Sequence, residues 1–295
     1  MSTSPKPHRE PRQMSRRAFL KLAMRGTLAT AVAGVGRLEY VRAVEPAWVT
    51  VQPVRLTLPR LASAFHGYRI AQISDIHMGD WMTRERLATV TALVNAQQPD
   101  LISLTGDFVT SLYGGVAGEL RAVLPTLTAR NGVVAVLGNH DHSAGPAVVR
   151  QVLRECGIRE LSNTAVTLQR GRGLLHLAGV DDVWHGQARL DETLAAVPAA
   201  GAAILLAHEP DFAATSAATR RFDLQLSGHS HGGQVVFPFV GPTQLPPLSR
   251  KYPLGRYQVG SLIQYTNRGV GMVRPHVRFN CPPEITLFTL ESPQA

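Results

Sequence analysis

Two histidines one residue apart, His229 and His231, stand among small and polar side chains in the stretch LSGHSHGGQ, residues 226–234. The glycines of this stretch leave room for another group to approach the backbone closely. A pair of imidazoles in this setting suits the binding of a metal ion, and it suits equally a polar turn that happens to contain histidine. The remainder of the chain has to decide between these two interpretations.

Polar residues of similar kinds follow the ends of five apolar segments that have the pattern of buried strands. These residues are Asp75 and His77, Asp107, Asn139 and His140, His208, and His229 and His231. Ligands of α/β sheets bind at the carboxyl ends of strands, where the loops converge. Five such coincidences are hard to attribute to chance, so we expect these side chains to share one site.

The donor atoms of this set favour transition metals. The candidate ligands are two carboxylates, one amide and four imidazoles: Asp75, His77, Asp107, Asn139, His208, His229 and His231. Period-two spacing predicts that both members of each closely spaced pair lie on one side of an extended segment. Oxygen and imidazole donors without thiolate suit Mn, Fe, Zn or Co. Seven donors exceed the needs of one tetrahedral ion and fit two divalent ions about 3.5–4 Å apart, which act on displacements at phosphorus.

The motifs DIH, GD, GNHD, AHEP and GHSHGGQ occur in this order at the predicted strand ends, and in them the chain resembles the calcineurin-like metallophosphoesterases. The resemblance extends over about residues 67–290. It implies an α/β fold, a four-layer α/β/β/α sandwich, with a dinuclear metal centre. One metal would be held by Asp75, His77 and His231. The other would be held by Asn139, His208 and His229, with Asp107 bridging the two.

The same resemblance implies catalytic roles for two residues that follow Asn139. His140 would protonate the leaving oxygen, and Asp141 would orient His140 through a carboxylate–histidine hydrogen bond. A hydroxide that bridges the two cations would attack phosphorus in line with the scissile P–O bond. His142 matches no position of the motifs, and we expect it to be a solvated loop residue.

The pattern of the chain predicts the elements that must position these residues. Strands alternate with helices, which are predicted at residues 83–97 with Thr83 as N-cap, at 116–129 and at 146–156. A hairpin is predicted over 164–182, and further strands follow it. Such alternation is typical of an α/β fold.

Composition and charge limit the possible partners. The 295 residues are 44% hydrophobic and 17% charged, as in globular proteins, and the net charge is +9. Residues 1–43 hold nine of the 30 basic and two of the 21 acidic residues, so residues 44–295 carry only +2. Such a domain lacks the basic footprint of nucleic-acid binding, and we expect no nucleic-acid partner. Cys156 and Cys281 are expected to be small buried hydrophobes, and the sequence does not assign them to a disulfide.

Residues 1–43 have the features of a targeting signal followed by a linker. Arg16 and Arg17 stand in the stretch SRRAFLK, and the weakly apolar residues 22–38 follow. The twin arginine resembles the signal of the Tat translocase, which exports folded proteins. We therefore expect the phosphoesterase domain, residues 44–295, in the periplasm or on the outer face of the cytoplasmic membrane. The alternative is a disordered tail.

These features together predict an exported, dinuclear-metal-dependent phosphoesterase. Residues 237–255 are apolar and irregular, with five prolines and the basic Arg250 and Lys251. Such a segment, with Trp81 and Met82 on the same rim, would make peripheral contact with a bilayer, or it would be a packed loop over the sheet. Membrane contact implies a membrane-associated or lipid-linked phosphodiester or pyrophosphate as substrate. The alternatives are a phosphodiesterase for soluble phosphodiesters or nucleotides, and a non-catalytic metal-binding module.

Replacing both Arg16 and Arg17 with Lys should trap the protein inside the cell, because the Tat translocase reads the arginine pair. The measurement is the distribution of the protein between cytoplasmic and exported fractions. The same exchange at Arg9 and Arg12 is the control and should leave export unchanged. Undiminished export of the Arg16/Arg17 variant would contradict the Tat interpretation.

Overall fold

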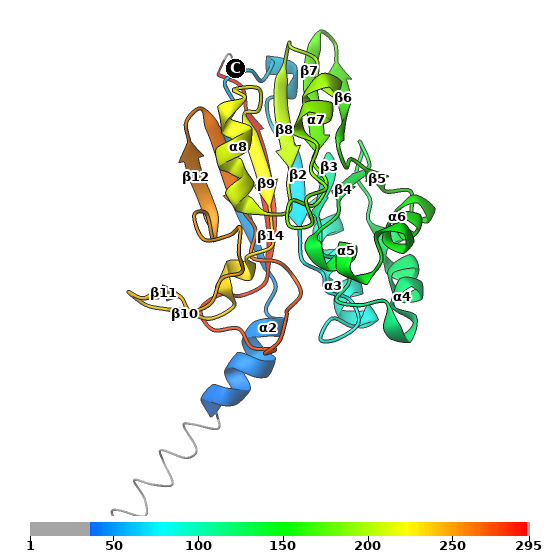
Figure 1. Ribbon diagram of the computed structural model, residues 1–295, viewed down its shortest axis with the longest axis vertical. Coiled ribbons are helices and arrows are strands. Elements are labelled where there is room, and N and C mark those ends of the chain that lie inside the picture. The colour runs from blue at the N-terminus through cyan, green and yellow to red at the C-terminus, as the bar shows by residue number, and fades with distance from the viewer. Residues whose placement is uncertain (1–35, 294–295) are drawn as a thin grey trace, which may run out of the picture.

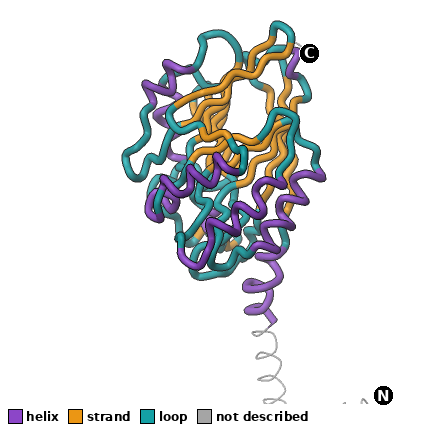
Figure 2. The backbone as a smooth tube through the Cα atoms, turned by 90° about the vertical axis from the view of Figure 1, so that its right-hand side faces the viewer, coloured by secondary structure: helices purple, strands orange, loops and turns teal. Residues whose placement is uncertain are grey.

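The computed structural model describes residues 36–293, so most of the predicted targeting signal lies outside the described residues. Two six-stranded sheets pack face to face, and helices cover their outer faces (Figure 1). The chain therefore folds as the expected α/β/β/α sandwich. Figure 2 shows the strands in the half of the molecule away from the N-terminal helix.

The first sheet is parallel except where β14 pairs with β2. Its strands, in spatial order, are β1 (Thr50–Thr57), β14 (Glu284–Glu291), β2 (Tyr68–Ile73), β3 (Leu101–Thr105), β4 (Val133–Val136) and β5 (Arg159–Glu160). Every residue of β3 and β4 is buried, because one face meets the second sheet and the other meets helices. This explains the continuous apolar runs in the sequence.

The second sheet has a parallel centre and an antiparallel hairpin at each edge. Its strands, in spatial order, are β12 (Gly255–Val259), β13 (Leu262–Thr266), β9 (Leu224–Ser227), β8 (Ala202–Leu206), β7 (Gly173–Gly179) and β6 (Thr164–Arg170). The hairpin predicted over 164–182 is thus confirmed as β6 and β7. An apolar core with residues from both sheets, such as Ile70 and Ile204, fills the space between them.

Helices on the two outer faces complete the layers. The first sheet is covered by α3 (Arg84–Ala96), α4 (Val116–Val123) and α6 (Pro146–Glu155), and the second by α7 (Leu190–Ala196) and α8 (Ala213–Ala218). Thr83 caps α3 as predicted, since its side chain accepts a hydrogen bond from the Arg86 amide. The helix α4 is shorter than predicted because Pro125 follows it and begins a separate 3₁₀ turn, Leu124–Thr126.

A short helical segment precedes the first strand and is attached to the sandwich. It comprises a π-helical turn, Tyr40–Val44, and α2 (Glu45–Ala47). The Arg278 amide donates a hydrogen bond to the Val41 carbonyl (2.9 Å), and the Cys281 amide donates one to Glu45 Oε1 (2.6 Å). The predicted domain boundary at residue 43 therefore falls inside this helical segment. Within residues 36–293, no helix is long and apolar enough to cross a membrane.

The carboxyl ends of the central strands of both sheets meet at one edge of the sandwich. The strands β2, β3 and β4 end there in the first sheet, and β8 and β9 end there in the second. The loops after these strands carry the predicted ligands, except that Asn139 begins the short helix α5 (Asn139–Ala144) after β4. The fold thereby brings segments more than 150 residues apart in sequence into contact, since His77 and His231 lie side by side.

Candidate metal centre

The predicted ligands converge at this edge. Six of the seven are at most 5% exposed, and Asn139 is half-buried. Ligand atoms of Asp75, His77 and His231 lie within 4.8 Å of one another, and the same holds for Asp107, His208 and His229. A third group of this kind joins His77 and Asp107 to His140. The arrangement matches two adjacent cation sites, with Asp107 in reach of both.

The two closely spaced ligand pairs, Asp75/His77 and His229/His231, lie after the strands and not on extended segments as predicted, whereas Asn139 begins the short helix α5 (Asn139–Ala144). The strand β2 ends at Ile73 and β9 ends at Ser227. Five ligands have a left-handed backbone: Asp75 (φ 53°), His77 (φ 50°), Asp107 (φ 57°), His229 (φ 68°) and His231 (φ 51°). Residues other than glycine adopt this conformation at a cost of about 1–3 kcal/mol each, and such residues cluster at functional sites.

Backbone hydrogen bonds between the loops fix these conformations. The Asp75 amide donates to the Gly106 carbonyl (3.0 Å), and the His229 amide donates to the Asp75 carboxylate (3.0 and 3.1 Å). Glycines permit the close approach, because a methyl group at Gly138 would overlap Asp107 Oδ1 and one at Gly228 would overlap Ser74 Oγ. The glycines around the histidines therefore make room for neighbouring loops.

Hydrogen bonds on the far side of two imidazoles set which nitrogen is free. His208 Nδ1 donates to the Thr105 carbonyl (2.7 Å), so its Nε2 is the nitrogen that faces Asp107 and the other ligands. His229 Nε2 donates to the Pro247 carbonyl (2.9 Å), which leaves its Nδ1 free. Metal-binding histidines in proteins have this arrangement, in which the second ring N–H donates to a carbonyl or carboxylate.

The buried ligand atoms of the cluster are arranged to fit a cation. Asn139 Oδ1 is buried and has no hydrogen-bond partner, and His208 Nε2 faces the carboxylate of Asp107 at 3.2 Å. His77 Nε2 and His231 Nε2 face each other at 3.0 Å, and His231 Nε2 lies 3.4 Å from Asp75 Oδ1. Buried acceptors without donors are costly, and divalent cations would satisfy them together. The donor set therefore fits divalent cations.

The electrostatics of the cluster favour forms that bind metal. Burial lowers the pKa of His229 to about 4, so its ring is neutral at physiological pH. Burial opposes ionisation of Asp107, yet His208 and His77 beside it hold its pKa well below the usual range. Burial also opposes protonation of His208, but Asp107 raises its pKa well above the usual value. A cation on His208 Nε2 would displace that proton, so metal affinity should rise with pH.

His140 is placed for proton transfer, but Asp141 does not contact its ring. The ring of His140 packs edge-on to His77 (4.7 Å between centroids) and is hydrogen-bonded to the Thr110 backbone. Burial lowers the pKa of His140. Both carboxylate oxygens of Asp141 accept backbone N–H groups, from Phe108 (2.8 Å), Val109 (3.2 Å) and Gly138 (3.0 Å). The predicted Asp141–His140 hydrogen bond is therefore wrong, and Asp141 instead joins two ligand loops.

Several residues near the site differ from their sequence-based placement. His142 is not solvated, because its Nε2 pairs with Asp181 Oδ1 (2.8 Å) and its side chain is 9% exposed. Met82 is buried. Trp81 packs against the apolar residues between the first sheet and its helices and lies beneath Arg86, so neither residue forms an exposed rim.

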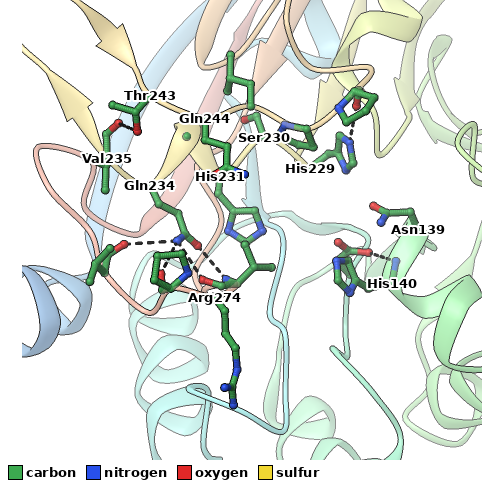
Figure 3. A pocket seen from close by; sticks show the side chains of 18 of the residues that line it. Asn139, His140, His229, Ser230, His231, Gln234, Val235, Thr243, Gln244 and Arg274 are labelled. Atoms are coloured by element: carbon green, nitrogen blue, oxygen red, sulfur yellow. Dashed lines mark hydrogen bonds between the residues drawn. The ribbon is translucent and has the colours of Figure 1, made fainter.

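A cavity of about 480 Å³ opens onto the ligand cluster. Figure 3 shows Asn139, His140, His229 and His231 on its metal side, with Val235, Thr243 and Arg274 farther along. Its remaining wall comes mainly from residues 243–247 and 273–277. Trp184 also lines it, and sequence reasoning missed this residue. The only signal for Trp184 was its position in GVDDVWHG, directly after an apolar strand.

Two packed sheets with carboxylate, amide and imidazole donors at their carboxyl ends define a metallophosphoesterase. The family model described as "Calcineurin-like phosphoesterase" matches residues 68–233, and the chain belongs to this family. The chain is thus a metal-dependent phosphoesterase.

Relatives share most of its length. It is 38% identical to the "Uncharacterized metallophosphoesterase YkuE" of Bacillus subtilis, over 95% of this chain and 99% of the relative. It is 32% identical to the "Phosphodiesterase YaeI" of Escherichia coli, over 94% and 99%. It is 30% identical to a "Transmembrane protein with metallophosphoesterase domain" of Danio rerio, over 90% of this chain and 61% of the relative. The similarity therefore includes the segments outside the family model.

Two alanine variants should separate metal binding from proton transfer. Asp107→Ala should abolish metal binding and activity together, because it removes the carboxylate that the two metal sites would share. His140→Ala should retain the metals and slow turnover roughly 10²–10⁴-fold, as expected for the loss of a general acid. The slowing should be smallest for leaving groups that need no proton, such as p-nitrophenolate. The measurements are bound metal by mass spectrometry and steady-state kinetics, and metal loss in His140→Ala would contradict its assignment.

Proposed function

We propose that the protein is a phosphodiesterase that works with two divalent cations. Asp75, His77 and His231 hold one, and Asn139, His208 and His229 hold the other, with Asp107 between them. When bound, such cations neutralise charge on the phosphoryl oxygens and activate water at neutral pH. The main support is the convergence of six ligands that are at most 5% exposed, beside the buried Asn139 Oδ1, which has no hydrogen-bond partner.

The chain's own residues complete this chemistry. His140 lies in the cavity wall, and its amide donates a hydrogen bond to Asp107 Oδ1 (2.9 Å), which fixes its position beside the bridging carboxylate. From there it protonates the leaving oxygen. Asp141 acts indirectly, because its buried carboxylate joins the loop after β3 to the loop after β4.

We further propose that the protein acts outside the cytoplasm, after export by the Tat translocase, on a membrane-associated or lipid-linked phosphodiester or pyrophosphate. Support comes from a short hairpin formed by β10 (Val236–Phe237) and β11 (Gly241–Pro242). The side chains at its tip are apolar and exposed: Phe237 (47%), Phe239 (109%) and Val240 (78%). Apolar groups so exposed are suited to contact with a bilayer.

The N-terminal helical segment adds apolar groups next to this hairpin. Leu38 is 46% exposed and Val44 is 51% exposed. The two features flank one stretch of chain, since the ring of Phe237 lies 5.6 Å from that of Phe279 and the Arg278 amide bonds to Val41. Figure 1 shows β10, β11 and α2 at the same end of the molecule. A bilayer would meet both features at once.

The chain between this hairpin and the metal centre suits an amphiphile. Residues 243–247 follow β11 directly and line the cavity with Leu245, Pro246 and Pro247. Farther along, Ser249 is fully buried, whereas Leu248 and Arg250 on either side of it are exposed. The segment 237–255 thus has an exposed apolar tip, followed by residues that line the cavity. A soluble phosphodiester remains the alternative substrate, and binding it would not require the exposed apolar tip.

Exchanging Phe239 and Val240 for Ser should abolish binding to anionic vesicles, because these side chains supply the exposed apolar contact. The variant should lose any preference for a vesicle-borne phosphodiester while hydrolysing bis(p-nitrophenyl) phosphate normally. Tyr113→Ser is the matched control, since Tyr113 is 87% exposed and lies outside the cavity. Equal loss on both substrates, or no vesicle binding by the unaltered protein, would contradict the membrane proposal.

A further inference from the structure

Trp184 is a large, partly exposed aromatic residue beside the metal centre. Its side chain is 43% exposed and lines the cavity together with Asn139 and His140. Its ring lies 5.7 Å from that of the ligand His229, at an interplanar angle of 67°. Exposure of an indole costs free energy that burial against a ligand would recover.

The loop that carries Trp184 is held by two fully buried carboxyl groups, those of Asp182 and Glu209. Glu209 accepts hydrogen bonds from the amides of Val183 (3.2 Å) and Trp184 (3.3 Å), and Asp182 accepts one from the His185 amide (2.7 Å). Glu209 also follows the ligand His208 directly in the chain. The backbone of Trp184 is thereby tied to the metal centre before any substrate binds, which lowers the entropic cost of using its indole as a binding surface.

The cavity has room for more than a phosphate. Its volume of about 480 Å³ is in the range of sites for small organic molecules. His229 lies between Trp184, which its ring contacts, and Pro247, whose carbonyl accepts its Nε2–H. A phosphoester bound at the metals would therefore have its ester group next to the indole.

We propose that Trp184 is a specificity-determining residue that stacks on a ring in the group esterified to the scissile phosphate. An aromatic ring, a nucleobase and the apolar face of a sugar share this chemistry. The proposal rests on the proposed phosphodiesterase function and specifies its substrate class further. Alanine substitution of an aromatic that stacks on a base costs roughly 5- to 150-fold in affinity.

The test compares two probes that differ only in the ring, phenylphosphonate and methylphosphonate, as inhibitors of bis(p-nitrophenyl) phosphate hydrolysis. Trp184→Ala should raise the inhibition constant of phenylphosphonate roughly 5- to 150-fold and leave that of methylphosphonate within about twofold. Trp184→Phe should restore most of the loss, whereas Trp184→Leu, which keeps apolar bulk without a ring, should not. Tyr113→Ala should change neither constant.

Equal weakening of both probes in Trp184→Ala would show that Trp184 merely supports His229, and it would overturn the proposal. No weakening of either, or no preference of the unaltered protein for the phenyl probe, would overturn it as well. If the protein fails to hydrolyse the reporter diester, the proposed function fails separately. The same two binding constants are then measured by calorimetry on metal-loaded protein, and they decide the role of Trp184 alone.

Discussion

The buried carboxylate of Asp107 is the interaction on which the rest of the structure depends. Its Oδ2 lies 3.4 Å from His77 Nε2 of the first sheet and 3.2 Å from His208 Nε2 of the second. Its Oδ1 accepts the amide of His140. A carboxylate that is only 1% exposed is costly to bury unless positive charge compensates it. Cations held by the loops of both sheets would supply that charge.

The loops around Asp107 are strained because many donors must reach one small volume. Five ligands adopt the left-handed backbone, and glycines such as Gly106 and Gly138 allow the loops to touch. Twelve strands in two sheets hold the loop ends in place, which is how a stable scaffold tolerates local strain at a site. Glu209 also ties the Trp184 loop to the same strand end, because it accepts the Trp184 amide.

The sequence was informative wherever local pattern decides structure. Apolar runs that end in Asp, Asn or His identified the strands and the ligands, and Thr83 identified the start of α3. The sequence was uninformative where contacts between distant segments determine the structure. The direction of the His229 and His231 side chains depends on the left-handed φ angles of their loop, which period-two spacing does not predict. Asp141 and His142 find their partners across 30 residues or more, in loops whose proximity only the folded sheet creates.

The central claim is that two cations share Asp107, and anomalous X-ray diffraction from crystals of metal-loaded protein tests it most directly. The account predicts two anomalous peaks about 3.5–4 Å apart. One should lie within bonding distance of Asp75, His77 and His231, the other within bonding distance of Asn139, His208 and His229, and both should contact Asp107. A single peak, or two peaks of which only one contacts Asp107, would contradict the account.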